Sequence, residues 1–192
     1  LFGHQVIPEM NRVGMLLDLS HTGHRATMEA MDLSDAPVTF SHSNAKSLYD
    51  HPRNLADDQI SRCAERDGVI GLNGHPAFIK AGTAAPSLDD YVAHVDTMVD
   101  KAGIDHVGIG LDFSHPPGHQ MPPSRYAKLI AQGVFTTGTL PPPPWHYPIG
   151  DARRIADLTE ALTRRGWREK DLRKLLGENF LRLFRAVWKP KN

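Results

Sequence analysis

The strongest constraint on the fold of this chain is a pair of short apolar runs that each end in the dipeptide Ser-His. The runs are Met15–Leu19 and Val38–Phe40, and they lead into Ser20-His21 and Ser41-His42. The stretch between them, residues 24–34, is rich in residues that favour helices. A strand, a helix and a second strand of these lengths predict a βαβ unit with parallel strands.

The two histidines are expected to meet at one edge of the sheet. Side chains alternate along a strand, so His21 shares a face with Leu19, and His42 shares a face with Phe40. Parallel neighbours place both imidazoles at the carboxyl ends of the strands, where α/β folds build their sites. Two neutral imidazoles there favour a divalent metal. The alternative, two polar strand ends hydrogen-bonded to nearby loops, stays equally open at this point.

The alternation of strand and helix continues along the chain. It predicts helices at 57–66, 88–102, 151–165 and 169–187, the last broken near Gly177, and strands at 69–73 and 106–113. Four strands, each followed by a helix, predict a parallel α/β sheet within one domain spanning residues 1–192. Residues 114–150 hold nine prolines and are expected to form a lid-like insertion.

Composition excludes several classes of function. The formal net charge is zero, which indicates neither a nucleic-acid-binding surface nor a surface for anionic membranes. No apolar run approaches the length of a membrane span, and the first ten residues lack the apolar core of a signal peptide. Cys63 is the only cysteine, so no disulfide within the chain and no thiolate cage can form. We expect a soluble chain, and no compartment is indicated.

Several other residues carry structural expectations. Asp18 has the opposite strand parity to His21, so we expect it to pair with a nearby helix or loop donor. His75, His94 and His106 are expected at the surface or in packing. The run Trp145-His146-Tyr147 either packs within its loop or contacts a substrate.

Six segments together resemble one protein family. In order, they are GMLLDLSH, FSHSNA, HPRNLADDQI, GVIGLN, DHVGIGLDF and LLGENFLRLF. They resemble the membrane (renal) dipeptidase family of zinc peptidases over nearly the whole chain except residues 114–150. The resemblance implies a TIM-type (β/α)8 barrel, of which this chain supplies roughly the last four βα units and the C-terminal helices. It also implies two zinc ions at the mouth of the barrel and cleavage of the peptide bond in dipeptides.

The resemblance assigns roles to four residues. His21 and His42 match the two histidines that hold the second zinc ion, and Arg53 matches the residue that binds the substrate carboxylate. Asp112 matches the catalytic acid beside the water and the departing amine. The family often has a second acidic residue two positions later, where this chain has Ser114.

The rest of the family site is expected outside this chain. The ligands of the first zinc ion and the glutamate that bridges both ions have no counterpart here, because the chain resembles only the C-terminal half of the family. We therefore expect a metallo-dipeptidase that needs an N-terminal half, and a chain that either self-associates or pairs with such a half-barrel. The alternatives are a catalytically incomplete remnant, a metal- or peptide-binding module, or another hydrolase of the amidohydrolase type. A small peptide is the expected substrate.

Overall fold

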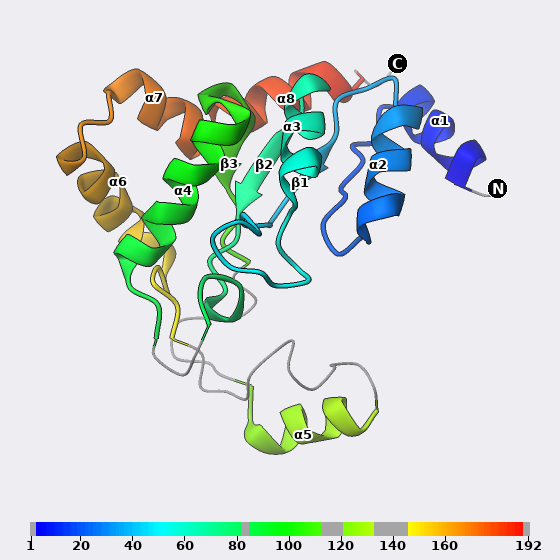
Figure 1. Cartoon of the computed structure of the whole chain (residues 1–192). Helices are drawn as coiled ribbons and strands as arrows, with labels where there is room; N and C mark the ends of the chain where they lie inside the picture. Colours follow the sequence, from blue (N-terminus) through cyan, green and yellow to red (C-terminus); the bar gives the residue numbers. More distant parts are fainter. Residues whose placement is uncertain (1–2, 82–84, 113–120, 133–145, 190–192) are drawn as a thin grey trace.

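A parallel sheet in the order β1-β2-β3 lies at the centre of the described part of the chain (Figure 1). The computed structural model describes residues 3–81, 85–112, 121–132 and 146–189. The strands are Thr39–Phe40 (β1), Val69–Leu72 (β2) and Val107–Ile109 (β3). Thr39 pairs with Val69, and Ile70 pairs with Val107, so neighbouring strands start nearly level. Parallel order confirms the predicted α/β class, although β3 is shorter than the predicted 106–113.

The predicted first strand, Met15–Leu19, does not form a regular strand. The segment nevertheless lies parallel to β1, because Leu19 N donates to Thr39 O at 2.8 Å and Thr39 N donates to Leu17 O at 3.0 Å. These two hydrogen bonds form a single isolated β-bridge between Asp18 and Thr39. The partner strand β1 has only two residues, so no longer ladder can form beside it. The adjacency that the βαβ pattern predicted is confirmed, while the regular strand is not.

Helices connect the strands and lie beside the sheet or across its ends (Figure 1). They are α1 (Gly3–Val13), α2 (His24–Leu33), α3 (Asp57–Glu65), α4 (Leu88–Ala102), α5 (Pro123–Ala131), α6 (Ile155–Arg164), α7 (Glu169–Arg173) and α8 (Asn179–Val187). Short 3-10 turns are η1 (Pro76–Phe78), η2 (Ile104–His106) and η3 (Ala152–Arg154), and a π turn, η4 (Lys174–Glu178), joins α7 to α8. Gly177 leaves helical geometry within η4, as predicted.

The termini of α4 follow the sequence signals closely. Ser87 Oγ accepts from Asp90 N at 3.1 Å, and the Asp90 carboxylate accepts from Ser87 N at 2.7 Å, which forms a reciprocal capping box. Gly103 ends the helix with φ of 81°, a conformation that glycine adopts without steric cost. The sequence therefore fixes both ends of this helix locally.

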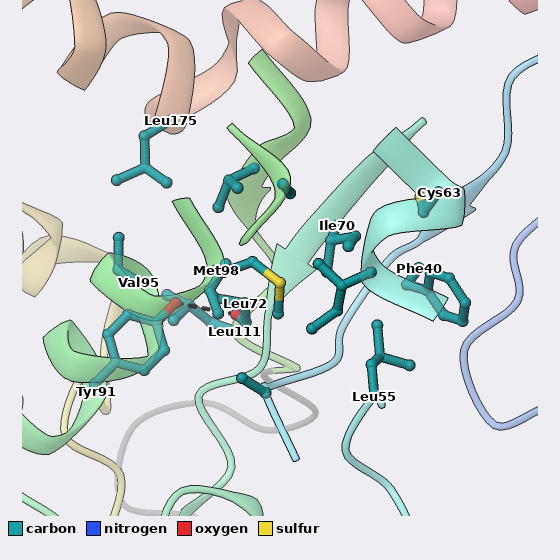
Figure 2. Close-up of a cluster of buried hydrophobic side chains, with 14 of the residues drawn as sticks. Phe40, Leu55, Cys63, Ile70, Leu72, Tyr91, Val95, Met98, Leu111 and Leu175 are labelled. Atoms are coloured by element: carbon teal, nitrogen blue, oxygen red, sulfur yellow. Dashed lines mark hydrogen bonds between the residues drawn. The ribbon is translucent and has the colours of Figure 1, made fainter. Parts of the chain in front are cut away.

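The main core lies between the sheet and α4 (Figure 2). Ile70 and Leu72 of β2 and Tyr91 and Met98 of α4 have no exposed surface. Burying one side chain of this size stabilises the fold by about 1.5–3 kcal/mol. The Tyr91 hydroxyl donates to Leu72 O at 3.0 Å, so this polar group is satisfied inside the core (Figure 2). Cys63 is fully buried, and burial raises the pKa of its thiol to about 12, as expected for an inert thiol.

Helix α8 covers the starting ends of the strands, opposite the edge that carries the histidines. Leu183 and Val187 pack against Val69, the first residue of β2. The ring of Phe180 lies where a Cβ at Gly108 would project, so this glycine makes room for an aromatic ring. The last helix thus docks onto the sheet through Leu183 and Val187.

The proline-rich insertion is described only in part. Helix α5 has no buried residue and stands apart from the sheet (Figure 1). Near the end of the insertion, Ile149 is fully buried. Tyr147 packs edge-on against His75, with ring centroids 5.3 Å apart. Residues 113–120 and 133–145, including Trp145, lie outside the described residues. A lid role stays a prediction.

Two glycines let the ends of β2 and β3 approach the residue before His42. A Cβ placed on Gly71 or on Gly110 would overlap the carbonyl oxygen of Ser41. Gly110 N donates to Leu72 O at 3.0 Å, and Ser43 N donates to Gly71 O at 2.8 Å, so sheet-like pairing continues past the strands. The close approach of these backbones sets the position of Ser41 and therefore of His42.

Changing Gly110 to Ala should destabilise the chain. The new Cβ meets a backbone oxygen rather than a flexible side chain, so the cost should lie at the upper end of the ~1–3 kcal/mol typical of overpacking. Gly150→Ala is the matched control, because its Cβ would make only ordinary contacts at 3.8 Å. Urea unfolding of both variants measures the difference. Equal stability of the two variants would contradict this account of the strand ends.

Candidate metal and substrate site

The structure brings His21 and His42 together at the carboxyl edge of the sheet. Their Nε2 atoms are 2.8 Å apart, and their ring centroids are 4.9 Å apart. His21 has φ of 64°, a left-handed conformation that is uncommon for a residue with a side chain and recurs at functional sites. The shared strand parity of the two residues therefore predicted the contact correctly.

The carboxylate of Asp18 links the two Ser-His dipeptides through hydrogen bonds to both serines. Its Oδ1 accepts from Ser20 N and from Ser41 N, each at 3.0 Å, and its Oδ2 accepts from Ser41 Oγ at 2.5 Å. Burial acts to raise the pKa of Asp18, but the hydrogen bonds from Ser41 and Ser20 outweigh it and hold the pKa below its ordinary value. Asp18 is therefore ionised at neutral pH. The expectation that it pairs with loop donors is confirmed.

The surroundings of His21 keep its imidazole neutral. Burial lowers the pKa of His21, and the nearby positive charge of Arg53 and the neighbouring His42 lower it further. The carboxylates of Asp112 and Asp18 oppose this effect without reversing it. A neutral imidazole keeps a lone pair on one ring nitrogen, which is the form that binds a metal.

The loop that carries Arg53 is held against the end of β2 by buried amides. Asn44 and Asn73 exchange hydrogen bonds, since Asn44 Nδ2 donates to Asn73 O and Asn73 N donates to Asn44 Oδ1, each at 3.0 Å. Asn54 Nδ2 donates to Tyr49 O and to Phe78 O, both at 2.9 Å. These bonds satisfy polar groups that would otherwise be costly to bury. These hydrogen bonds place Arg53 beside His21 and His42.

Arg53 is half-buried and only partly hydrogen-bonded. One terminal nitrogen donates to His42 O at 3.3 Å, and the guanidinium carbon lies 5.5 Å from the centroid of the Phe78 ring. Its Nε is buried and has no hydrogen-bond partner within the described residues. Burial lowers the pKa of Arg53, with Asp112 and Asp18 acting against it, yet a guanidinium stays charged at any physiological pH. The site thus holds a cation with a free donor.

Asp112 follows β3 at the same edge of the sheet. It is exposed and has φ of 59°, the second left-handed residue in the site. Its charge acts on His21, Arg53 and Tyr147, which indicates that its carboxylate faces the same opening as these groups. The structure therefore gathers all four residues that the sequence singled out.

His75 is a buried neighbour of the site that the sequence did not assign to it. It is 6% exposed and stacks on Phe78, with ring centroids 4.9 Å apart. Its Nδ1 accepts from Ala77 N at 3.2 Å, and burial lowers its pKa to about 4, with the charges of Asp112 and Arg53 acting in opposite directions. Of the two expectations for His75, surface or packing, the structure therefore confirms packing. The only signal in the sequence was its place two residues after a strand end.

His94 and His106, the other two histidines expected at the surface or in packing, also have structural roles. His94 is buried, accepts from Ala45 N at 3.3 Å through Nδ1 and donates to Ile79 O at 2.8 Å through Nε2. It therefore ties the loop after His42 to the turn after β2. His106 is half-buried and donates from Nδ1 to Gly68 O at 2.9 Å, far from the histidine edge.

A cavity of about 240 Å³ opens beside His21 and Arg53. Its lining comes from the loop after Leu19, the start of α2, the loop that carries Arg53 and the start of α3. Two buried polar atoms on its lining residues, Ser43 Oγ and Asn54 Oδ1, have no hydrogen-bond partner within the described residues. A small polar molecule or group could enter here next to the guanidinium.

The donor set fits part of a metal site. Nitrogens bound to one zinc ion at about 2.0–2.1 Å in a tetrahedral arrangement lie about 3.3 Å apart, so the His21–His42 pair needs only a small opening. The described residues contain no group of three or more histidine, cysteine or acidic side chains that could hold a metal. A catalytic zinc site usually has three protein ligands. His21 and His42 alone are therefore fewer ligands than such a site needs.

Comparison with known proteins identifies the family. The family model of membrane dipeptidases, peptidase family M19, matches residues 1–133 and 146–192. The chain belongs to this family. The resemblance found in the six sequence segments is thereby confirmed.

Curated relatives and solved structures of this family are longer than the chain. A protein of Schizosaccharomyces pombe described as an uncharacterized dipeptidase is 36% identical over 97% of this chain and 39% of its own length. An amidohydrolase from Pseudomonas aeruginosa superposes with a TM-score of 0.85 at 33% identity, covering 97% of this chain and 57% of that one. A metallo peptidase from Rhodobacter sphaeroides, solved with a phosphinate mimic of the dipeptide L-Ala-D-Ala, gives 0.75 at 31% identity over 97% and 46%. The chain thus spans about two fifths of the length of the curated relatives it matches.

These similarities support the fold at a coarse level. The chain has the α/β architecture of membrane dipeptidases and amidohydrolases, and family membership implies a metal cofactor. No helix in the described part is long and apolar enough to cross a membrane.

The buried state of His75 should make the stability of the chain depend on pH. Its pKa falls from 6.5 in the unfolded chain to about 4 in the folded one, so between these values the unfolded state binds the extra proton. Stability is therefore lost as pH falls from about 6.5 to about 4, by up to about 3 kcal/mol at about 1.4 kcal/mol per pH unit. His75→Asn keeps an acceptor for Ala77 N and removes the titration. Urea unfolding at several pH values should show a flatter profile for the variant, and parallel profiles would contradict the assignment.

Proposed function

We propose that this chain is the C-terminal half of a metal-dependent dipeptidase, with roughly the last four βα units of a (β/α)8 barrel. The observation that carries the proposal is the convergence of four side chains at one sheet edge. His21 and His42 present Nε2 atoms 2.8 Å apart, Arg53 bonds His42 O, and the charge of Asp112 acts on His21 and Arg53. Two nitrogen ligands, a cation and a free carboxylate are the groups that metal-assisted amide hydrolysis requires.

His21 and His42 would hold one of two zinc ions. Both offer a ring nitrogen on the open side of the sheet edge, and the surroundings keep His21 neutral. The ligands of the other ion and the bridging glutamate would come from the N-terminal half. When bound, such ions polarise the scissile carbonyl and lower the pKa of a coordinated water from 15.7 to about 7.

Arg53 would bind the C-terminal carboxylate of the substrate. Its guanidinium makes one long bond to His42 O, and its buried Nε has no partner within the described residues, so donors remain for an anion. The cation–π contact with Phe78, 5.5 Å from the guanidinium carbon to the ring centroid, helps to hold the guanidinium in place. A carboxylate bound by Arg53 would lie near the histidines, because Arg53 bonds the main-chain oxygen of His42 at 3.3 Å. Short peptides, and dipeptides above all, are therefore the expected substrates.

Asp112 would carry a proton from the attacking water to the departing amine. The carboxylate is exposed at the opening and is not held by a hydrogen bond to a described residue, so it is free to accept and donate. Its charge acts on both His21 and Arg53, and the scissile bond would lie between these two residues. General acid–base transfer of this kind contributes about 10²–10⁴-fold to the rate.

The sheet supports an N-terminal half-barrel, or a second copy of the chain, as the partner. The Leu17–Leu19 segment and β3 lie at the two ends of the sheet, and each is paired on one side only among the described strands. Open edges of this kind expose backbone donors and acceptors to pairing with another chain. Met15, beside the first edge, is 56% exposed.

The proposed activity can be tested by supplying the N-terminal half. The chain is extended with the residues encoded upstream of Leu1, or mixed with the N-terminal half of a relative, and is assayed on L-Ala-D-Ala and on a simple lactone. Dipeptide turnover should appear only in the completed assembly, vanish with a chelator and fall by about 10²–10⁴-fold in Asp112→Asn. Preference for the lactone would favour another amidohydrolase-type activity. An inactive, properly assembled protein would favour the catalytically incomplete remnant.

The chain alone should bind zinc weakly through His21 and His42. Two ligands are fewer than the three usual at catalytic zinc, so occupancy should be partial after mild dialysis. Calorimetric titration with Zn²⁺ and elemental analysis measure it, and His21→Ala with His42→Ala should abolish the binding. His4→Ala is the control, since His4 is exposed on α1. Stoichiometric zinc that survives the double change would remove the assignment.

Arg53→Lys should impair dipeptide turnover in the completed assembly and leave its metal content unchanged. Lysine keeps the charge but loses the planar fork, so kcat/KM should fall by the equivalent of about 1.5–3 kcal/mol, the worth of a hydrogen bond to a charged group. Arg62→Lys is the matched control, because Arg62 pairs with Asp32 and Glu65 on the outer surface. Unchanged kinetics in Arg53→Lys would show that this residue does not bind the substrate.

A further inference from the structure

A chain of three hydrogen-bonding groups runs behind His42. Ser41 Oγ lies 2.5 Å from Asp18 Oδ2 and 2.7 Å from His42 Nδ1. Ser41 Oγ carries a single hydrogen, whereas an ionised carboxylate can only accept. The short, charge-assisted bond to Asp18 takes that hydrogen. The other oxygen in reach, Ser20 Oγ, lies at 3.4 Å, which is too far to compete.

The direction of this bond decides which nitrogen of His42 carries a proton. Because Ser41 Oγ donates to Asp18, it can only accept from His42, so Nδ1 must hold the hydrogen. Nε2 then has the lone pair, and Nε2 is the atom that faces His21. The main-chain nitrogen of His42 is also fixed, since it donates to Ser20 Oγ at 3.1 Å. Both the ring and the backbone of His42 are therefore held.

We propose that Asp18 is a positioning residue that acts through the Ser41 hydroxyl to fix His42 as the Nδ1–H tautomer with Nε2 ready for the metal. The proposal rests on the proposed function only in treating His42 as a metal ligand. Partners of this kind orient metal-bound histidines in many proteins, and their loss costs about 10–100-fold in metal affinity. Asp18 thus gains a role in the site beyond pairing with loop donors.

The arrangement also assigns the tautomer of His21. A contact of 2.8 Å between two Nε2 atoms needs one proton between them. With the proton of His42 on Nδ1, His21 must donate from its own Nε2. The two imidazoles should therefore be opposite tautomers in the absence of metal. The tautomer of His21 is thus a second measurement that checks the assignment for His42.

Asp18→Asn gives a sharp test because it should reverse the whole chain of bonds. Oδ1 of residue 18 accepts from two backbone nitrogens, Ser20 N and Ser41 N, so an asparagine oxygen must keep that place. The asparagine Nδ2 then replaces Oδ2 and donates to Ser41 Oγ. The Ser41 hydroxyl must now donate to His42 Nδ1, which moves the His42 proton to Nε2.

Long-range ¹H–¹⁵N NMR of the ¹⁵N-labelled full chain, recorded without metal, reads both tautomers. We expect Nδ1–H for His42 and Nε2–H for His21 in the unchanged chain, with His42 reversed in Asp18→Asn. Ser41→Ala should release His42 from a single tautomer, and Ser41→Thr, which keeps the hydroxyl, should restore it. Ser43→Ala and Asp50→Asn are the controls, because Ser43 Oγ has no partner within the described residues and Asp50 pairs with Lys46 at the surface.

Zn²⁺ titration of the same variants separates this inference from the proposed function. Asp18→Asn and Ser41→Ala should lose about 10–100-fold in zinc affinity relative to the unchanged chain and to Ser41→Thr. Nε2–H on His42 in the unchanged chain, or no change of tautomer in Asp18→Asn, would overturn the inference. The predicted tautomers without any zinc binding would support the positioning role of Asp18 and contradict His42 as a metal ligand. Circular dichroism verifies that each variant is folded. If Asp18→Asn does not fold, the contrast between Ser41→Ala and Ser41→Thr still tests the inference.

Discussion

The site depends on how closely Ser41 approaches the ends of β2 and β3. Its carbonyl oxygen occupies the space that a side chain at Gly71 or Gly110 would fill, and its hydroxyl and amide bond the Asp18 carboxylate. Backbones can come this close only where Cβ is absent. Because Ser41 is fixed on both sides, the next residue, His42, has little freedom. The orientation of His42 toward His21 therefore follows from backbone packing at the strand ends.

The charges around His21 act together with burial so that its imidazole stays neutral. Burial lowers the pKa of His21, and the positive charge of Arg53 lowers it further. Asp18 and Asp112 act in the opposite direction from two sides, one below the strand ends and one at the opening. Neutral imidazole, charged guanidinium and free carboxylate can thus coexist near neutral pH. That combination is suited to holding a metal and an anionic substrate at the same edge.

The outer parts of the fold keep this edge in place. Helix α8 covers the starting ends of the strands through Leu183 and Val187, so the histidine edge is the one left open. On that edge, Asn44 and His94 tie the loop after His42 to the turns after β2. The cavity beside Arg53 lies within these tied loops, so its walls are anchored to the core.

The sequence by itself predicted most of the element order and which residues gather at the carboxyl edge of the sheet. Strand parity placed His21 and His42 on one edge, the capping box of Ser87 and the glycine at 103 fixed α4, and the Pro-Arg-Asn segment pointed to Arg53. These signals are local or follow a fixed period, so they survive without knowledge of the fold. They also predicted a strand at 15–19, which forms only a single bridge, and a strand at 106–113, which the structure shortens to Val107–Ile109. Both outcomes depend on how many residues the neighbouring strand can pair.

Tertiary structure alone decided the contacts between distant segments. Asp18 and Ser41 are 23 positions apart, and only the pairing of the Leu17–Leu19 segment with β1 brings the carboxylate to the hydroxyl. His75 became buried because Phe78 and Tyr147 close over it from two different segments. Gly108 and Gly110 looked alike in the sequence, yet one accommodates the Phe180 ring and the other the Ser41 carbonyl. A sequence pattern shows which residues share a face, whereas what meets that face depends on chain segments that only folding brings together.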